Sequence, residues 1–141
     1  MNIRFINGAN FEYSNAFALE TDYYKGIKRP SLEIHFPIAV ITYAQLEELL
    51  SDTANFQKIL LTGDTQSYPV YKDEVDEHGN QVVDHFEEYT PQNLYIGYDI
   101  KGKITVDDEE ITVKLYKKSD LEIENEEAMA IIDELLIAME V

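Results

Sequence analysis

The most informative absence from this 141-residue sequence is cysteine, of which there is none. Without cysteine, disulfide bonds, thiolate metal ligands and thiol nucleophiles are all excluded. Basic residues are also scarce, with 11 Lys and Arg against 28 Asp and Glu and a formal net charge of −17. This balance disfavours direct binding to nucleic acid or to an anionic membrane surface, because both depend on Lys and Arg.

Long hydrophobic runs are missing as well. No segment approaches the roughly 20 apolar residues that a membrane-spanning helix needs, and the N-terminus lacks the apolar core of a signal peptide. We therefore expect neither a signal peptide nor a transmembrane segment. Hydrophobic residues still make up 45% of the chain, which is typical of a globular protein with a real core. A single domain spanning residues 1–141 is the expected organisation.

The clearest structural signal lies between Arg29 and Gly63. Leu32, Ile34 and Phe36 alternate with polar residues, which predicts a half-buried strand. Thr42 and Gln45 then have the spacing of a capping box, which predicts a helix over about residues 42–52. An apolar strand at residues 59–61 follows. Together with the other strands, this predicts an α+β fold made mainly of antiparallel sheet.

Two further patterns predict strands before and after the segment between Arg29 and Gly63. The first is a single strand in which Phe11, Tyr13, Phe17 and Leu19 share one face, ending in a turn at residues 23–26. The second is an alternating strand that reaches Ile100, turns at residues 101–102 and returns.

Residues 64–90 differ from the rest of the chain because they are acidic, polar and aromatic. Their flanks have β-branched and aromatic residues around a turn at residues 76–80, which predicts a protruding acidic β-hairpin over about residues 66–90. Tyrosine and phenylalanine provide rigid contact surfaces, so this arm is a candidate partner-binding element. The same aromatic residues could instead be cross-strand pairs that hold the hairpin together. The candidate contact residues are Tyr68, Tyr71, Asp73, Glu74, Asp76, Glu77 and Phe86.

The C-terminal segment predicts a helix over about residues 122–140. Its apolar face, which includes Ile132, Leu136, Met139 and Val141, is broader than one contact with a sheet requires. Two explanations are open: the helix lies across a sheet, which is the more ordinary arrangement, or part of the face is buried against another chain. Ile132, Leu136 and Met139 are therefore candidate partner-binding residues.

The sequence has no pattern that indicates catalysis, a cofactor or a metal site. The three histidines have no metal-ligand spacing, and no serine lies in a Gly-x-Ser-x-Gly motif. A calcium-loop frame over residues 74–85 places His85 where a bidentate glutamate is required, so a hairpin turn explains these residues better. No glycine-rich phosphate loop follows a strand either.

Several short segments resemble small proteins encoded among the tail and baseplate genes of phages and prophages of Gram-positive bacteria. They are residues 5–8, Tyr13 with residues 16–17, residues 23–26, 29–34, 41–43, 113–116 and 138–141. The resemblance implies a structural or tail-assembly protein that self-associates or contacts other tail proteins, in the bacterial host cytoplasm or in the virion. It does not extend to residues 64–90.

Two other classes of function stay open from the sequence. An acidic protein can imitate the charge of DNA and inhibit a host defence or DNA-processing enzyme, since complementary potentials steer encounters. A small hydrolase with an acidic metal site is a further possibility, because aspartate and glutamate are abundant.

Overall fold

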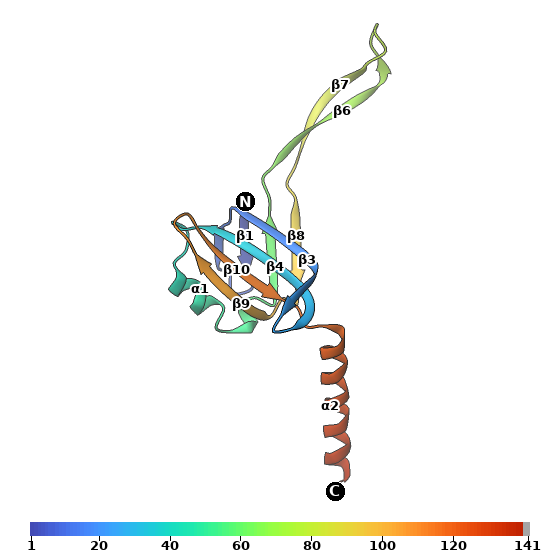
Figure 1. The fold of residues 1–141 in the computed structure, drawn as a ribbon. Helices are drawn as coiled ribbons and strands as arrows, with labels where there is room; N and C mark the ends of the chain where they lie inside the picture. The colour runs from blue at the N-terminus through green and yellow to red at the C-terminus, as the bar shows by residue number, and fades with distance from the viewer. Residues whose placement is uncertain (140–141) are drawn as a thin grey trace.

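The structure is a computed structural model that describes residues 1–139, and it consists of a β-sandwich from which two elements project (Figure 1). The first sheet has the strand order β2 (Asn10–Glu12), β1 (Asn2–Phe5), β5 (Lys58–Thr62) and β8 (Gln92–Ile96). The second has the order β3 (Asn15–Tyr24), β4 (Ile27–Pro37), β10 (Glu110–Tyr116) and β9 (Ile100–Val106). Neighbouring strands are antiparallel throughout, which confirms the predicted α+β class.

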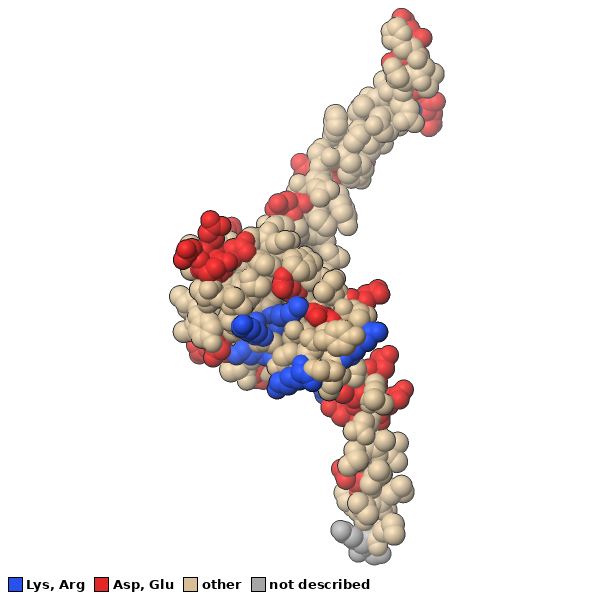
Figure 2. Space-filling view, viewed as in Figure 1, with Lys and Arg blue, Asp and Glu red and all other residues tan. Residues whose placement is uncertain are grey.

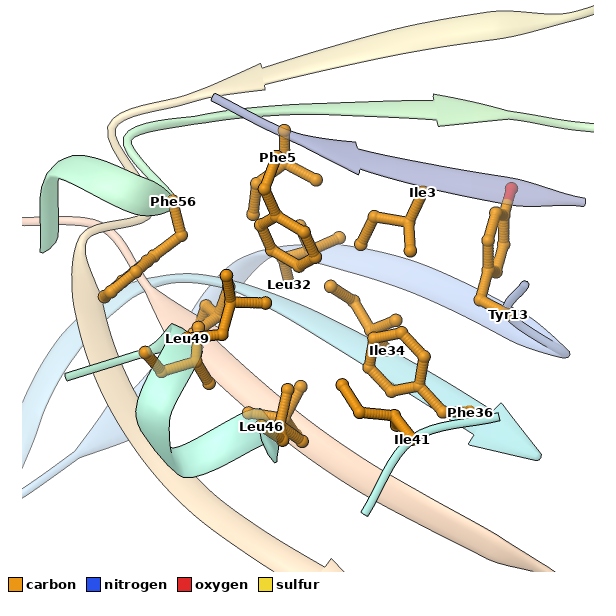
Figure 3. Close-up of a cluster of buried hydrophobic side chains, with 14 of the residues drawn as sticks. Ile3, Phe5, Tyr13, Leu32, Ile34, Phe36, Ile41, Leu46, Leu49 and Phe56 are labelled. Carbon is orange, nitrogen blue, oxygen red and sulfur yellow. The ribbon is translucent and has the colours of Figure 1, made fainter. Parts of the chain in front are cut away.

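One hydrophobic core lies between the two sheets (Figure 3). The inner strands of both sheets supply it, because alternate residues of a strand point to the same side. The strand residues of the core are Ile3 and Phe5 from β1, Leu32, Ile34 and Phe36 from β4, Ile59 and Leu61 from β5, and Ile111, Val113 and Leu115 from β10. The predicted half-buried strand at residues 29–36 is thus confirmed.

Helix α1 (Tyr43–Leu49) adds to this core through Leu46 and Leu49, followed by a short 3-10 helix, η1 (Thr53–Asn55). The Thr42 hydroxyl accepts a hydrogen bond from the Gln45 backbone N–H at 3.1 Å, and the Gln45 side chain accepts one from the Thr42 N–H at 3.0 Å. The predicted capping box and helix are confirmed, although the helix ends before residue 52.

The predicted strand face that joins Phe11 to Leu19 is wrong. Tyr13 and Ser14 separate β2 in the first sheet from β3 in the second, so the chain changes sheet within the expected strand. Phe11 packs against the core, whereas Phe17 and Leu19 are 43% and 47% exposed. Ala16 takes the inward position of β3, where it is paired with Ile34.

Two predicted turns are also displaced. Residues 101–102 lie inside β9, where a Cβ on Gly102 would come within 2.6 Å of the Tyr116 ring, so this glycine serves a close approach. Tyr24 belongs to β3, and the turn into β4 consists of Lys25 and Gly26 alone, with φ of +51° and +78°. Positive φ at both positions is typical of the two-residue turn that matches strand twist.

The predicted hairpin is confirmed and forms a projecting arm, β6 (Gln66–Val75) and β7 (Gln81–Tyr89), whose strands pair only with each other within residues 1–139. The chain enters the arm from β5 and returns to β8, which pairs with β5. Between them, the Gly63 N–H donates to the Pro91 carbonyl at 2.8 Å. The arm therefore extends the β5–β8 pair away from the sandwich.

Helix α2 (Asp120–Met139) leaves the sandwich at the end away from the arm (Figure 1). None of its described residues is buried, so the expectation that it lies across a sheet is wrong. The inner faces of both sheets are already covered by each other, and the outer face of the second sheet has polar residues such as Glu33, His35 and Lys114. The predicted helix end at Glu140 and the predicted apolar contact of Val141 lie outside the described residues.

Candidate functional site

The arm carries seven of the ten candidate residues, and all seven side chains are exposed. On one face, Tyr68 and Glu87 are opposite each other, and the Tyr68 hydroxyl donates to the Glu87 carboxylate at 2.8 Å. The Nε2 atom of His85 lies 2.9 Å from the Glu87 carboxylate, and its Nδ1 atom lies 2.8 Å from the Asp84 carboxylate. Tyr68 thus has a structural partner within the hairpin as well as an exposed ring.

These hydrogen bonds shift the pKa values of three side chains of the arm. The hydrogen bonds of His85 with Glu87 and Asp84 raise the pKa of His85. The hydrogen bond from Tyr68 to Glu87 raises the pKa of Tyr68. The bonds from His85 and Tyr68 in turn lower the pKa of Glu87. The arm therefore keeps a protonated histidine between carboxylates to a higher pH than a free histidine would allow.

Pro69 is paired with Phe86 and Tyr71 with Val83, on either side of the Val70–His85 pair and a shift in strand register. Phe86 is 65% exposed, so its position opposite Pro69 leaves most of the ring in solvent. Tyr71 also lines a shallow depression with Asp73 and Glu74. The aromatic residues are therefore cross-strand neighbours and also accessible, and their role as partner contacts stays a prediction.

Hydrogen bonds within the turn stabilise the tip of the arm. The Asp76 carboxylate accepts hydrogen bonds from the N–H groups of His78 and Asn80 at 2.8 Å and 2.9 Å. Glu77 follows as an exposed residue of the same turn, and Gly79 has φ of +79°. Asp76 is therefore a turn-forming residue, as the hairpin interpretation of this segment predicts.

The other three candidate residues, Ile132, Leu136 and Met139, are all exposed on α2. They belong to a larger group of nine apolar α2 side chains that are 42% to 80% exposed. The other members are Leu121, Ile123, Met129, Ile131, Leu135 and Ile137. The 3.6-residue periodicity of the helix identified Ile131, Ile132, Leu135, Leu136 and Met139 as one apolar face from the sequence, but not the other four residues or the exposure of all nine.

The junction between α2 and the sandwich consists of hydrogen bonds and ion pairs. Ser119 and Glu122 form a capping box, because the Ser119 hydroxyl accepts from the Glu122 N–H and the Glu122 carboxylate accepts from the Ser119 N–H. Glu122 also lies 2.8 Å from Arg29, which is 5% exposed, and Lys118 lies 2.7 Å from Glu126. Burial acts to raise the pKa of Glu122, but the hydrogen bonds from Ser119 and the charge of Arg29 outweigh it, so the pKa is lowered.

Sequence reasoning missed Arg29 as a functional residue because a single arginine in a strand has no distinguishing local pattern. The Ser119-x-x-Glu122 spacing was a usable signal, since it is the same capping-box pattern that identified α1. The two sets of candidate residues are not brought together. They lie on the arm and on α2, at opposite ends of the sandwich (Figure 1).

Charge is distributed unevenly over the surface. Lys28, Arg29, Lys117 and Lys118 surround the junction with α2, and Figure 2 shows Lys and Arg side chains on that half of the sandwich. Acidic side chains gather instead at the arm tip, at the turn of residues 107–110 and on the first half of α2 (Figure 2). On the face that Figure 2 shows, the carboxylates therefore form separate groups rather than one continuous surface.

Residues 1–139 contain no group of three or more His, Asp or Glu side chains arranged to hold a metal ion. His35 illustrates why, because its two ring nitrogens are each 2.9 Å from a carboxylate, those of Glu33 and Glu110. Over the same residues the structure has no helix with both the length and the apolar character needed to cross a bilayer.

Comparison of the chain with protein-family models, curated proteins and solved structures finds no significant match. The resemblance to phage tail-region proteins therefore stays a prediction. The candidate sites are the two projecting elements, each of which presents apolar side chains to solvent.

Proposed function

We propose that this protein is a non-enzymatic structural or tail-assembly protein of a phage or prophage, acting through protein–protein contacts and above all through self-association. Its place would be the bacterial host cytoplasm during assembly or the finished virion. The observation that carries the proposal is α2, a helix of 20 residues in which no described side chain is buried.

Physical chemistry explains why such a helix favours a partner. An isolated helix of this length is only marginally stable in water, and most helices in proteins are stabilised by packing of their apolar face. Contiguous exposed apolar surface on a protein usually marks an interaction site. Nine large apolar side chains on one projecting helix are therefore a strong reason to expect that α2 is covered in the functional assembly.

The arm supports the same proposal independently. A two-stranded hairpin that packs on nothing is at best marginally stable in water. Exposed Tyr68, Tyr71 and Phe86 would gain contacts if the arm lay against a neighbouring protein. A sandwich with accessible extensions at opposite ends can contact two neighbours at once, which is what a repeated structural unit requires.

Light scattering coupled to size-exclusion chromatography tests the proposal. The full chain is expected to have a mass that is a multiple of the monomer, and the double variant Ile132→Asp with Leu135→Asp is expected to be monomeric. Glu127→Gln, on the acidic side of α2, is the matched control and is expected to associate normally. A monomeric full chain that is also absent from purified phage particles would contradict the proposal.

The distribution of charge does not favour the inhibitor hypothesis. Imitation of DNA requires carboxylates spaced along one surface, and on the face shown in Figure 2 the acidic side chains are divided among separate groups. Salt-sensitive capture of a basic host enzyme would nevertheless favour that hypothesis over ours.

A further inference from the structure

A second, more specific pattern exists within the exposed apolar residues of α2. Six positions follow one another at intervals of four, three, four, three and four residues. They are Leu121, Asn125, Ala128, Ile132, Leu135 and Met139. This is the spacing of positions a and d in a coiled coil, with Asn125, Ile132 and Met139 at a and the other three residues at d. The six side chains form one seam along the helix.

The charges of α2 lie mainly away from this seam. The helix contains seven acidic residues and no Lys or Arg. Five of the seven occupy positions b and c of the heptad, which point outward from a coiled coil. Of the other two, Glu122 is paired with Arg29 within the chain, which leaves only Glu124 beside the seam.

This distribution decides between two kinds of partner. A basic foreign helix would be favoured by acidic residues at the e and g positions, where interhelical ion pairs form. In the second half of α2 these positions instead have apolar residues, namely Met129, Leu136 and Ile131. An uncharged seam with apolar flanks suits another helix of the same kind, so a second copy of this chain is the partner that fits.

The junction with the sandwich leaves the seam accessible. Glu126, which contacts Lys118, and Ile123, which lines the junction depression, occupy positions b and f. With 3.6 residues per turn, these positions lie on the side of the helix roughly opposite the a and d residues. Glu122, at position e beside the seam, contacts Arg29, so the chain's own sandwich borders the first turn of the seam. From Asn125 onward the seam residues are exposed, and a neighbouring α2 can approach them there.

We propose that α2 forms a parallel, in-register bundle with α2 of other copies of this chain, in which Asn125 faces Asn125. The inference rests on the proposed function and names its partner and geometry. In this arrangement the side-chain amides, each with donors and an acceptor, can hydrogen-bond to one another. A buried asparagine at position a is a known determinant of coiled-coil register.

An antiparallel arrangement is less favourable for the same residue. Full overlap of two antiparallel α2 helices would place Asn125 opposite Leu135, leaving the buried amide without a hydrogen-bonding partner. The parallel bundle also places all sandwiches at one end and all C-termini at the other. The apolar residues at e and g make the apolar face wider than the contact between two helices requires, as in bundles with a broader apolar face.

Single-cysteine cross-linking tests the geometry, since the natural sequence has no cysteine to interfere. The full chain is used with Asn125→Cys, with Leu135→Cys, or with Glu127→Cys as the outward-facing control, and each is oxidised. We expect Asn125→Cys to form disulfide-linked dimers by itself, while Glu127→Cys remains near background. Light scattering on the reduced variants checks that each one still associates.

The outcomes separate this inference from the proposed function. If Asn125→Cys forms a disulfide only when mixed with Leu135→Cys, the bundle is antiparallel and the inference is wrong. If the reduced variants associate but no α2 cysteine cross-links, self-association uses another surface and only the inference fails. If the full chain is monomeric, both fail.

Discussion

The sandwich and its two projections contain similar apolar residues, which are buried in the sandwich and exposed on the projections. Phe36 in β4 is fully buried between the sheets, whereas Phe86 on the arm has most of its surface in solvent. Leucine and isoleucine fill the core and also cover α2, where none of them is buried. Hydrophobicity alone therefore does not locate the core, because topology decides which apolar face finds a partner within the chain.

The largest expected contrast is between these two phenylalanines. Phe36→Ala should lower the free energy of unfolding by about 3–5 kcal/mol, because it removes a buried ring and leaves a cavity. Phe86→Ala should change it by no more than about 0.5 kcal/mol, as for exposed positions in general. Urea unfolding at one fixed protein concentration measures both. Equal losses would mean that the arm belongs to the same cooperative unit as the sandwich.

A second contrast uses backbone strain. Gly26 and Gly79 have nearly identical φ, of +78° and +79°, one in the sandwich and one at the arm tip. Replacing either with alanine forces a left-handed conformation that costs about 1–2 kcal/mol. Only Gly26→Ala should lower the global free energy of unfolding, since the arm can open locally without the sandwich. Amide hydrogen exchange should show that Gly79→Ala affects residues 66–89 alone, and loss of protection in β5 would contradict this expectation.

The two capping boxes provide a smaller test. Thr42→Ala should reduce the global free energy of unfolding by about 1 kcal/mol, because α1 packs on the core and loses its N-cap. Ser119→Ala removes the equivalent bond from α2 and should lower helix content in circular dichroism without moving the urea midpoint of the sandwich. The control for both is Ser67→Ala, an exposed residue of β6 outside either box. A shift of the sandwich midpoint by Ser119→Ala would show that α2 stabilises the fold directly.

The smallest expected effect is a dependence on pH. Burial acts to lower the pKa of His35, but its hydrogen bonds with Glu33 and Glu110 outweigh this, so the pKa is raised. A histidine whose pKa is higher in the folded state contributes stability that is complete below its unfolded pKa of about 6.5 and is lost as pH rises through the folded pKa. The difference in urea midpoint between the natural chain and His35→Gln should therefore shrink as the solution becomes alkaline.

His85→Gln is the matched control, since His85 also lies between two carboxylates but on the exposed arm. It should leave the pH dependence of global unfolding unchanged. A His35→Gln difference that is constant with pH would show that the imidazole contributes through packing against Phe17, whose ring centre lies 5.6 Å away, and not through charge.

Local patterns predicted the parts of the fold that local physics determines. The alternation of Leu32, Ile34 and Phe36, the capping box at Thr42 and the β-hairpin arm are each determined by residues that are close in sequence. The sheet change at Tyr13 and Ser14 could not be predicted this way, because alternation continues through it while the partner strands change. Gly102 was interpreted as a turn residue because its close neighbour, Tyr116, is distant in sequence.

The candidate sites were predictable to a different degree. The candidate contact residues of the arm and of α2 were chosen by composition and helical periodicity, and the structure places all ten on projecting elements. What periodicity could not provide is the identity of the surface that covers α2, since an amphipathic helix has the same pattern against a sheet as against another chain. The seam that contains Asn125 can be found in the sequence alone, by looking for positions that recur every seven residues.

The way the arm and α2 join the sandwich determines how the molecule would carry a mechanical load. The arm continues into β5, which lies between β1 and β8, and α2 follows β10, which lies between β4 and β9. A pull between the arm and α2 would thus act along the central strands β5 and β10, each hydrogen-bonded on both sides, and along the edge strand β8, which pairs with β5. Tension of this kind loads many hydrogen bonds at once by sliding them, instead of opening them one after another as a zipper would.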